Sequence, residues 1–394
     1  MDTIITLPKN VKRIITTLET AGYSAYIVGG SVRDSLRGKT PKDWDVATSA
    51  KPEDVKKLFR RTIDTGLKHG TVTVLEKKDC IEVTTYRIDG KYTDGRRPDD
   101  VKFSSDIHED LARRDFTINA IAYNPLKGIV DPFEGCFDLK NELIKCVGNP
   151  KERFEEDSLR MLRGIRFAAQ FGYKIQTDTL RAMSAQPSRL SIVSKERVRE
   201  ELSKLLMGDY VEYINLLQEA GLTLYALDAE INIKSISGYI KKCRKDECTR
   251  LAVLCKDIPN TDNFLRNLRY DNKTINEVSL LVSQIPVDYS SDRVFVKRLL
   301  RKMPLQLIEK IIEIKEILFG VNLTGVLLTG VDIINNNECY DMSALAVNGV
   351  DLMKIGVPSG KRVGEVLESL LEMVIHIPEM NVQEVLLKEA RGFT

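Results

Sequence analysis

The feature that most constrains the fold is an apolar segment followed by two glycines and then by two aspartates one residue apart. Residues 25–28 form a β-prone run, Gly29 and Gly30 follow it, and Asp43 and Asp45 precede a second apolar pair. This order predicts a strand, a glycine turn, a short helix and a second strand. Residues two apart on a strand project from one face, so Asp43 and Asp45 are placed to bind one or two divalent cations.

These glycines and carboxylates together indicate nucleotidyl transfer. A turn without β-carbons lets backbone N–H groups approach phosphates, while cations held by carboxylates neutralise a triphosphate and align the attacking and leaving oxygens. Each part alone is ambiguous, because a Gly-Gly pair is typical of any turn and Asp-x-Asp of a solvated loop or a helix cap. Trp44, between the aspartates, is expected to point to the opposite, buried face.

Charge, cysteine and histidine content exclude several classes of protein. The 394 residues carry 59 Lys plus Arg and 57 Asp plus Glu, so the net charge of +2 gives no global attraction to nucleic acid. Seven cysteines without a Cys-x-x-Cys pair are typical of reduced thiols in the cytosol and not of a zinc site. With three scattered histidines, a His-rich phosphohydrolase site cannot form, so catalysis must depend on carboxylates.

Membrane and secretion signals are lacking in the sequence. The first residues, MDTIITLPKN, contain no apolar signal-peptide core, and no apolar run reaches the roughly 18 residues that span a bilayer. We therefore expect a cytoplasmic protein without a membrane partner.

A hairpin and a loop follow the two aspartates. The alternating β-branched runs at 71–75 and 81–86 predict two paired strands. Glu82, on the second of them, is a candidate third acidic ligand or an ordinary solvent-facing residue. Residues 89–100 are rich in Gly, Asp and Arg and are expected to be either a plain surface connection or a mobile lid over a nucleotide.

A basic pair opens the next segment. Residues 113–122 are expected to begin a helix with an apolar face. Arg114 and Asp115 would meet a triphosphate and a ribose there, or would form an ion pair at the end of the helix.

A long helix is expected over residues 150–167, with one apolar flank. Glu156, Asp157, Arg160 and Arg163 recur at three- and four-residue intervals, so acids and guanidinium groups share a face. Ordinary salt bridges are one interpretation. The other is base recognition, because an acceptor beside a donor complements the exocyclic amino group and ring nitrogen of cytosine or adenine.

Beyond residue 171 the pattern is helical throughout. Pro259, Asn260 and Pro286 separate the helical segments. A turn at 356–361 precedes a further helix, whose N-terminus either accepts an RNA phosphate or simply starts the helix.

Seven motifs in this order resemble the class II tRNA nucleotidyltransferase and poly(A) polymerase family of the DNA polymerase beta-like superfamily. They are GGSVRD, DWD, TVTV, DGRRPDD, RRDFTINA, DPFEGCFDL and RFEEDSLRMLRGIRF, between about residues 22 and 205. The resemblance implies an α+β fold, in which a catalytic head with a small mixed sheet precedes an all-helical neck, body and tail. We expect the head at 1–140, the neck with the nucleotide-selecting motif at 141–207, and RNA-binding body and tail at 208–320 and 321–394.

The resemblance also implies roles for individual residues. Asp43 and Asp45 would be the catalytic residues and the ligands of Mg²⁺. Glu156, Asp157 and Arg160 would read the incoming CTP or ATP as a protein template, supported by Arg163. The remaining nucleotide-binding residues would be Gly29, Gly30 and Arg33 at the triphosphate and Arg114, Asp115 and Asn119 at the ribose and phosphate.

The implied activity is template-independent addition of CCA to the 3′ end of tRNA from CTP and ATP, with release of pyrophosphate. The tRNA acceptor arm is the implied partner, and the oligomeric state stays open. Residues 89–100 resemble the loop of members that add the terminal A, which argues against a CC-only enzyme. An A-adding enzyme, a poly(A) polymerase and a catalytically silent RNA-binding relative are the alternatives, and intact acidic and EDxxR motifs argue against the last.

Overall fold

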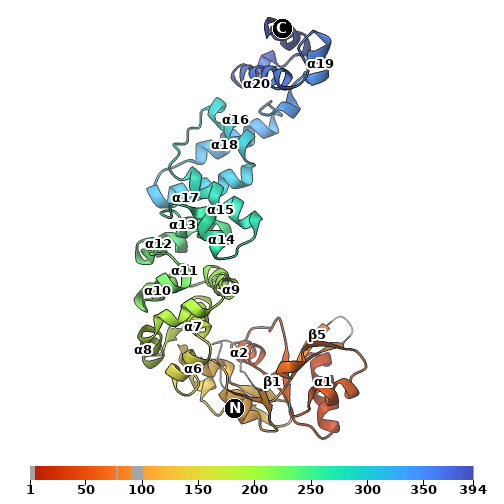
Figure 1. Cartoon of the computed structure of the whole chain (residues 1–394), viewed down its shortest axis with the longest axis vertical. Helices are drawn as coiled ribbons and strands as arrows, with labels where there is room; N and C mark the ends of the chain where they lie inside the picture. The colour runs from red at the N-terminus through yellow and green to blue at the C-terminus, as the bar shows by residue number, and fades with distance from the viewer. Residues whose placement is uncertain (1–4, 77–78, 91–100, 394) are drawn as a thin grey trace. The chain divides into compact units, whose positions relative to one another are not determined.

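The computed structural model describes residues 5–76, 79–90 and 101–393, which fold into two compact units (Figure 1). Unit 1 comprises Met1–Lys241 and Arg266–Tyr270, and unit 2 comprises Lys242–Leu265 and Asp271–Thr394. The predicted lid lies mostly at 91–100, outside the described residues. No helix among the described residues is long and apolar enough to cross a membrane.

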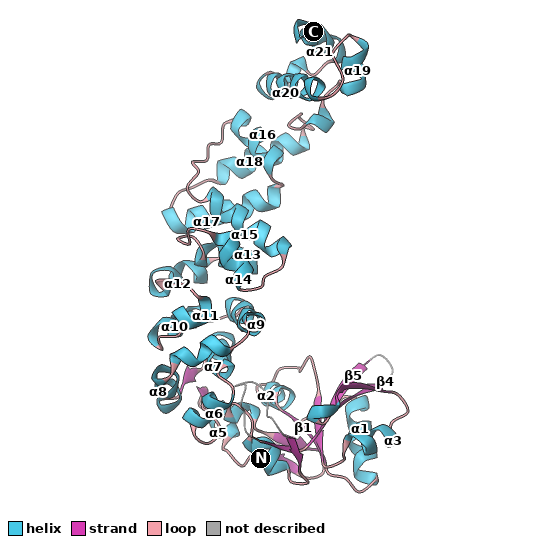
Figure 2. Cartoon of the chain, in the orientation of Figure 1, coloured by secondary structure: helices cyan, strands magenta, loops and turns pink. Residues whose placement is uncertain are grey.

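A seven-stranded mixed sheet forms the N-terminal part of unit 1 (Figure 2). Its order is β3-β4-β5-β2-β1-β8-β9, in which β2 is parallel to β5 and the other neighbours are antiparallel. The strands are β1 (Ala25–Val28), β2 (Asp45–Thr48), β3 (Thr62–Gly66), β4 (Thr71–Glu76), β5 (Asp79–Thr85), β8 (Ala122–Asn124) and β9 (Gly128–Val130). Two short ladders pair β6 (Arg87–Asp89) with β7 (Val101–Phe103) and β10 (Leu143–Ile144) with β11 (Lys174–Ile175).

The sheet is buried on both faces around β1, as the alternation of a central strand requires. Ala25 and Ile27 join the cluster with the buried residues of α1 (Lys9–Thr20), whereas Tyr26 and Val28 join the cluster with Leu111 of α4 (Ile107–Ala112). Trp44 packs, partly buried, against the first cluster, as its sequence position predicts. The turn after β1 is therefore fixed by a strand that cannot shift its register.

The other helices of the first part of the chain surround this sheet or continue from it. They are α2 (Gly30–Leu36), α3 (Pro52–Leu58), α5 (Gly135–Lys140), α6 (Pro150–Glu156), α7 (Leu159–Phe171), α8 (Thr177–Ala185), α9 (Lys195–Leu206), α10 (Asn215–Glu219), α11 (Thr223–Leu227) and α12 (Ile233–Lys242). The predicted order of strand, glycine turn, short helix and strand is confirmed by β1, α2 and β2.

The expected helix over 113–122 is wrong. The helix α4 ends at Ala112, and after a turn only the 3₁₀ segment Thr117–Asn119 precedes β8. Phe116 is fully buried, and its backbone forms an antiparallel β-bridge with Cys146. The N–H of Thr117 donates to the carbonyl of Lys145 over 2.9 Å. These contacts with a later segment hold the backbone extended, so tertiary packing overrides the local helical pattern.

The expected continuous helix over 150–167 is also wrong, because α6 ends before α7 begins. Asp157 between them has extended backbone (φ −146°, ψ 102°). Its carboxylate accepts a hydrogen bond from the N–H of Leu159 over 3.1 Å, which satisfies a donor at the start of α7. The break gives Glu156 and Asp157 different directions, so these two acids do not share one helix face.

Unit 2 is built from helices and loops in its described residues (Figure 2). Helix α20 begins directly after the predicted glycine turn, at Lys361, and its Val366, Leu370 and Val374 lie in a hydrophobic cluster. The helices from α13 onward are α13 (Glu247–Leu254), α14 (Thr261–Asn267), α15 (Asn272–Gln284), α16 (Arg293–Lys302), α17 (Leu305–Phe319), α18 (Thr324–Asn335), α19 (Gly349–Lys354), α20 (Lys361–His376) and α21 (Gln383–Ala390). The α+β class with a small mixed sheet followed by helices is thus confirmed.

Candidate functional site

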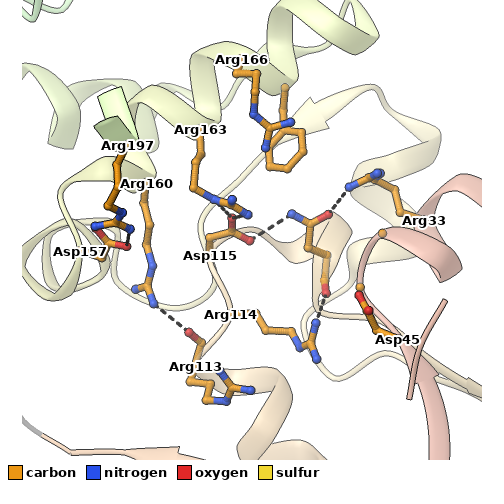
Figure 3. A pocket seen from close by; sticks show the side chains of 14 residues that line it. Arg33, Asp45, Arg113, Arg114, Asp115, Asp157, Arg160, Arg163, Arg166 and Arg197 are labelled. Atoms are coloured by element: carbon orange, nitrogen blue, oxygen red, sulfur yellow. Dashed lines mark hydrogen bonds and ion pairs between the residues drawn. The ribbon is translucent and has the colours of Figure 1, made fainter. Parts of the chain in front are cut away.

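A cavity of about 510 Å³ in unit 1 is bordered by the turn after β1, the segment after α4 and the helix α7 (Figure 3). Its lining contains seven arginines and three aspartates, which makes it a basic site suited to a polyanion. The lining residues are Gly29, Gly30, Arg33, Asp45, Arg113, Arg114, Asp115, Asn119, Asp157, Arg160, Arg163, Arg166, Phe167 and Arg197.

The turn at Gly29 brings backbone close to a guanidinium group. Gly29 has φ 70° and ψ −131°, a conformation that side chains disfavour. A β-carbon at this position would also lie 3.0 Å from Nη1 of Arg114. The backbone conformation therefore favours glycine here, and a side chain at this position would also press against the Arg114 guanidinium.

Asp45 opens β2 beside two other acidic residues. It is in register with Val28 on one side and with Glu82 of β5 on the other, so Asp45 and Glu82 project from the same face. Surrounding protein atoms raise the pKa of the Asp45 carboxyl, Glu82 raises it further, Arg114 opposes the shift, and Asp43 adds to it. Like charges thus gather at this edge of the cavity.

Asp43 lies before β2 and is exposed, and it does not line the cavity. The two aspartates therefore do not share a strand, although Asp43 is close enough to affect the charge of Asp45. Within the described part of the chain, no three His, Cys, Asp or Glu side chains form a group that could hold a metal. A magnesium ion here would need oxygen ligands from a substrate as well, which is how proteins usually bind it.

A chain of hydrogen bonds crosses the middle of the cavity (Figure 3). Arg163 donates from Nε to Oδ2 of Asp115 over 2.8 Å, and Asn119 donates from Nδ2 to Oδ1 of Asp115 over 3.0 Å. Arg33 donates from Nη1 to Oδ1 of Asn119 over 2.7 Å. Burial by itself would raise the pKa of Asp115, but Arg163 and Asn119 lower it well below its usual range. This series of hydrogen bonds fixes Arg33 from α2 and Arg163 from α7 relative to each other.

Two aromatic rings of α7 also hold Arg33. Its guanidinium carbon lies 5.3 Å from the ring centre of Phe167 and 4.8 Å from that of Phe171. The carboxylate of Asp34 accepts bonds from Nε and Nη2 of Arg33 over 2.9 and 3.0 Å. These contacts leave Arg33 in one orientation at the border of the cavity.

At the N-terminal end of α7, the acidic side chains are arranged differently from what the sequence pattern predicts. Arg160 bonds to Glu156 and donates to the carbonyls of Arg153 and Arg113, each over 3.1 Å. Asp157 instead accepts bonds from Arg197 of α9 over 2.7 and 3.2 Å. Asp157 and Arg160 line the cavity, whereas Glu156 is not among its lining residues.

The cavity therefore unites ten of the predicted residues: Gly29, Gly30, Arg33, Asp45, Arg114, Asp115, Asn119, Asp157, Arg160 and Arg163. Four lining residues were not singled out from the sequence as site residues: Arg113, Arg166, Phe167 and Arg197. Arg197 of α9 reaches the cavity through its bonds to Asp157, forty residues earlier in the sequence, so its place there depends on the tertiary fold.

Family models match most of the chain. Residues 25–145 match the model described as "Poly A polymerase head domain", residues 172–229 match "Probable RNA and SrmB- binding site of polymerase A", and residues 245–390 match tRNA nucleotidyltransferase domain 2. The CCA-adding enzyme of Enterococcus faecalis is 36% identical over 408 residues, which cover 98% of this chain and 97% of that protein.

Solved structures give the same match. The crystal structure of the Bacillus stearothermophilus CCA-adding enzyme in complex with CTP is 31% identical, with a TM-score of 0.85 and coverage of 98% of this chain and 99% of the other. The Thermotoga maritima CCA-adding enzyme complexed with tRNA is 22% identical, with a TM-score of 0.70 and coverage of 98% and 96%, and supports the fold alone.

Proposed function

This chain belongs to the CCA-adding enzymes of the tRNA nucleotidyltransferase and poly(A) polymerase family, and from that membership we propose that it adds CCA to the 3′ end of tRNA from CTP and ATP. The observation that carries the proposal is the cavity that joins the acidic start of β2 to the arginines of α7. A nucleotide fits such a site, because its phosphates need cations and its base needs paired donors and acceptors.

The residues at the N-terminal end of α7 are proposed to select the nucleotide. Arg160 is held by Glu156 and by two carbonyls, and Asp157 is held by Arg197. A carboxylate acceptor and a guanidinium donor fixed in this way can bond to the amino group and ring nitrogen of cytosine or adenine. Preformed orientation supports selectivity, because little ordering remains to be done when the nucleotide binds.

The arginines nearer the glycine turn are proposed to hold the triphosphate. Arg33 and Arg114 flank Gly29 and Gly30 in the cavity, while Asp115 and Asn119 stand beside them for the ribose. The 3′-hydroxyl oxygen of tRNA attacks the α-phosphorus, the bond to the bridging oxygen breaks, and pyrophosphate leaves. Fixed cationic side chains stabilise the negative charge that develops on the departing pyrophosphate.

Magnesium is the proposed cofactor, with Asp43 and Asp45 as its protein ligands. The donor set fits this ion, because carboxylate oxygens are its preferred ligands and the crowded charge at Asp45 would be relieved by a cation. When bound, Mg²⁺ supplies acidification of the attacking hydroxyl and neutralisation of phosphate charge.

The proposal also includes the parts of the chain outside the cavity. We assign the head to 1–140, the neck to 141–207, and tRNA acceptor-arm binding to 208–320 and 321–394. The match of residues 172–229 to an RNA-binding model supports RNA contacts at the end of the neck and at the beginning of the body. The described cysteines remain thiols, which supports a cytoplasmic location.

Incubation with a tRNA that lacks its 3′ end, with CTP, ATP and Mg²⁺, tests the activity. We expect addition of C, C and A and then arrest, read on a sequencing gel. If the wild-type protein incorporated no nucleotide, the proposed enzymatic activity would be refuted. Addition of A only to tRNA that already ends in CC would identify an A-adding enzyme, and long A tails on unrelated RNA would identify a poly(A) polymerase. The named relatives are CCA-adding enzymes, so neither alternative is favoured.

A further inference from the structure

A buried carboxylate lies directly behind the cavity without lining it. Asp110, on the last turn of α4, is fully buried, and Ile107 and Leu111 of the same short helix are also buried and belong to a hydrophobic cluster. Burial of an ionised carboxylate is costly unless opposite charges and hydrogen bonds compensate for it. Its partners therefore indicate why a charge is kept at this position.

Both partners of Asp110 are arginines of the cavity. Oδ1 accepts from Nε and Nη2 of Arg113 over 3.0 and 2.7 Å, and Oδ2 accepts from Nη2 of Arg114 over 3.0 Å. Burial by itself would raise the pKa of Asp110, but Arg114 and then Arg113 bring it below its usual value. The ionised carboxylate is thus favoured, and it bonds to two neighbouring guanidinium groups at once.

The two arginines do not depend equally on this carboxylate. Arg113 also lies 3.6 Å from Asp89, so it has a second acidic partner. Among the described residues, Arg114 has besides Asp110 only a longer bond, 3.4 Å from Nη1 to the carbonyl of Asn119, and its buried Nε has no hydrogen-bond partner there. Asp110 is therefore the main restraint on the direction of the Arg114 guanidinium.

The direction of Arg114 matters because of what it faces. Its Nη1 occupies the space next to Gly29, and its charge lowers the pKa of Asp45. A guanidinium free to rotate would leave the glycine turn or would turn toward the carboxylates at the start of β2. Holding it at the turn keeps a donor aimed at an incoming phosphate and keeps Asp45 available for a cation.

We propose that Asp110 is a positioning residue that acts through Arg114 to present a fixed donor to the phosphates of the nucleotide. The proposal rests on the function proposed above, because it presumes that a nucleoside triphosphate fills the cavity. Phosphates are common to CTP and ATP, so Asp110 serves both nucleotides alike and takes no part in base selection.

Steady-state kinetics of the full-length Asp110→Asn enzyme with tRNA, CTP and ATP test this. The amide keeps the size of the side chain but removes the charge and turns a donor toward the guanidinium groups. We expect KM to rise about tenfold for each nucleotide, with the ratio of CTP to ATP incorporation and the affinity for tRNA unchanged. An unchanged KM in an enzyme whose wild type adds CCA would overturn this inference alone, whereas an inactive wild type would overturn the proposed function.

A double-mutant cycle separates positioning from general support of the fold. If Asp110 acts through Arg114, adding Asp110→Asn to Arg114→Ala changes KM by less than about twofold, because the positioned group is already gone. Independent, multiplying effects would contradict the proposal. Asp138→Asn is the matched control, since Asp138 is also buried but accepts its side-chain bond from Thr117 outside the cavity.

A second variant covers the case in which Asp110→Asn does not fold at the assay temperature. Asp110→Glu keeps the charge and moves the carboxylate by one methylene group. We expect a higher KM for both nucleotides with Tm close to that of Asp138→Asn. A normal KM with a lowered Tm would show that Asp110 serves only stability.

Discussion

The two walls of the cavity treat charge in opposite ways. The sheet wall, formed by Gly29, Gly30 and Asp45 with the neighbouring Glu82, gathers like charges, and the pKa of Asp45 is raised. The helix wall, formed by Asp157, the cavity residues of α7 and Arg197, pairs guanidinium groups with carboxylates of the wall itself and of the segment after α4. There Asp157 bonds to Arg197, and Arg163 bonds to Asp115.

The difference shows which charges the protein compensates with its own side chains and which need a cation from solution. The helix wall has its charges compensated before any ligand arrives, so it is ready to discriminate between bases. The sheet wall carries repulsion that a cation from solution would relieve. Substitutions at the sheet wall should therefore change the rate and spare stability, whereas those at the helix wall should change selectivity or stability.

The sharpest test of the sheet wall is Asp45→Asn. We expect nucleotide incorporation to fall by about a thousandfold or more, because a ligand of the catalytic cation is lost. The free energy of unfolding should stay equal or rise, since repulsion by Glu82 is removed. Single-turnover incorporation and urea denaturation measure the two quantities.

The matched control for this substitution is Asp54→Asn, because Asp54 lies on α3 near the same sheet, pairs with Lys57 and does not line the cavity. It should leave incorporation unchanged. Persistent activity in Asp45→Asn would refute the metal assignment, and lost tRNA binding would show a wider disturbance.

On the helix wall, Arg160→Ala should blur the choice of nucleotide. Loss of a bidentate donor typically removes about 1–3 kcal/mol of discrimination, so misincorporation should rise about tenfold or more. Competition between CTP and ATP on tRNA ending before each position measures the ratio. Arg181→Ala is the control, because its side chain on α8 is 77% exposed and pairs only with Asp178 among the described residues. Equal loss for both nucleotides with unchanged selectivity would contradict the template role.

The sheet wall could be predicted from the sequence because its signals are local. The β-prone run, the glycines and the aspartates lie within about twenty residues, and β1, α2 and β2 follow their predicted order. The sequence identified Glu82 as a candidate ligand on another strand. It did not predict the register of β2 against β5, which places Glu82 beside Asp45. Pairing between separate strands depends on the whole sheet.

The helix wall was harder to predict because its geometry depends on distant partners. Helical spacing placed Glu156 and Asp157 on one face, but Asp157 interrupts the helix and pairs with Arg197, forty residues later in the sequence. The Asp-Ser pair at 157–158 is typical of a helix start and could have predicted the break. The extended backbone at Phe116 had no such signal, because its cause is an antiparallel β-bridge to Cys146, thirty residues later in the sequence.

A second substitution on the helix side tests stability instead of selectivity. Asp115→Asn should lower the free energy of unfolding by about 1–2 kcal/mol at pH 7, because it removes the charge bonded to the partly exposed Arg163. The folded-state pKa of Asp115 lies below its unfolded value, so this contribution is present at neutral pH and is lost as pH falls into the acid range. The gap between wild type and variant should therefore narrow on acidification.

Urea denaturation at pH 7 and at a pH well below 3.8, the ordinary value of an aspartate, measures this gap, with Asp178→Asn as the control on an exposed ion pair. A gap that widens in acid would show that Asp115 is not ionised in the folded state.

The smallest expected effect is that of Glu82→Gln at the sheet wall. This substitution distinguishes a Glu82 that only repels Asp45 from one that binds the metal. Asp45 must be ionised to hold a cation, so activity should fall as pH decreases through its raised pKa. Burial is the larger cause of that shift and Glu82 the next, so Glu82→Gln should move the acidic limb of kcat/KM to lower pH by a fraction of a unit. If Glu82 is instead a third ligand, Glu82→Gln lowers activity at every pH and raises the Mg²⁺ concentration needed for half-maximal rate. A full pH profile at two Mg²⁺ concentrations distinguishes a neighbour that only repels from one that binds.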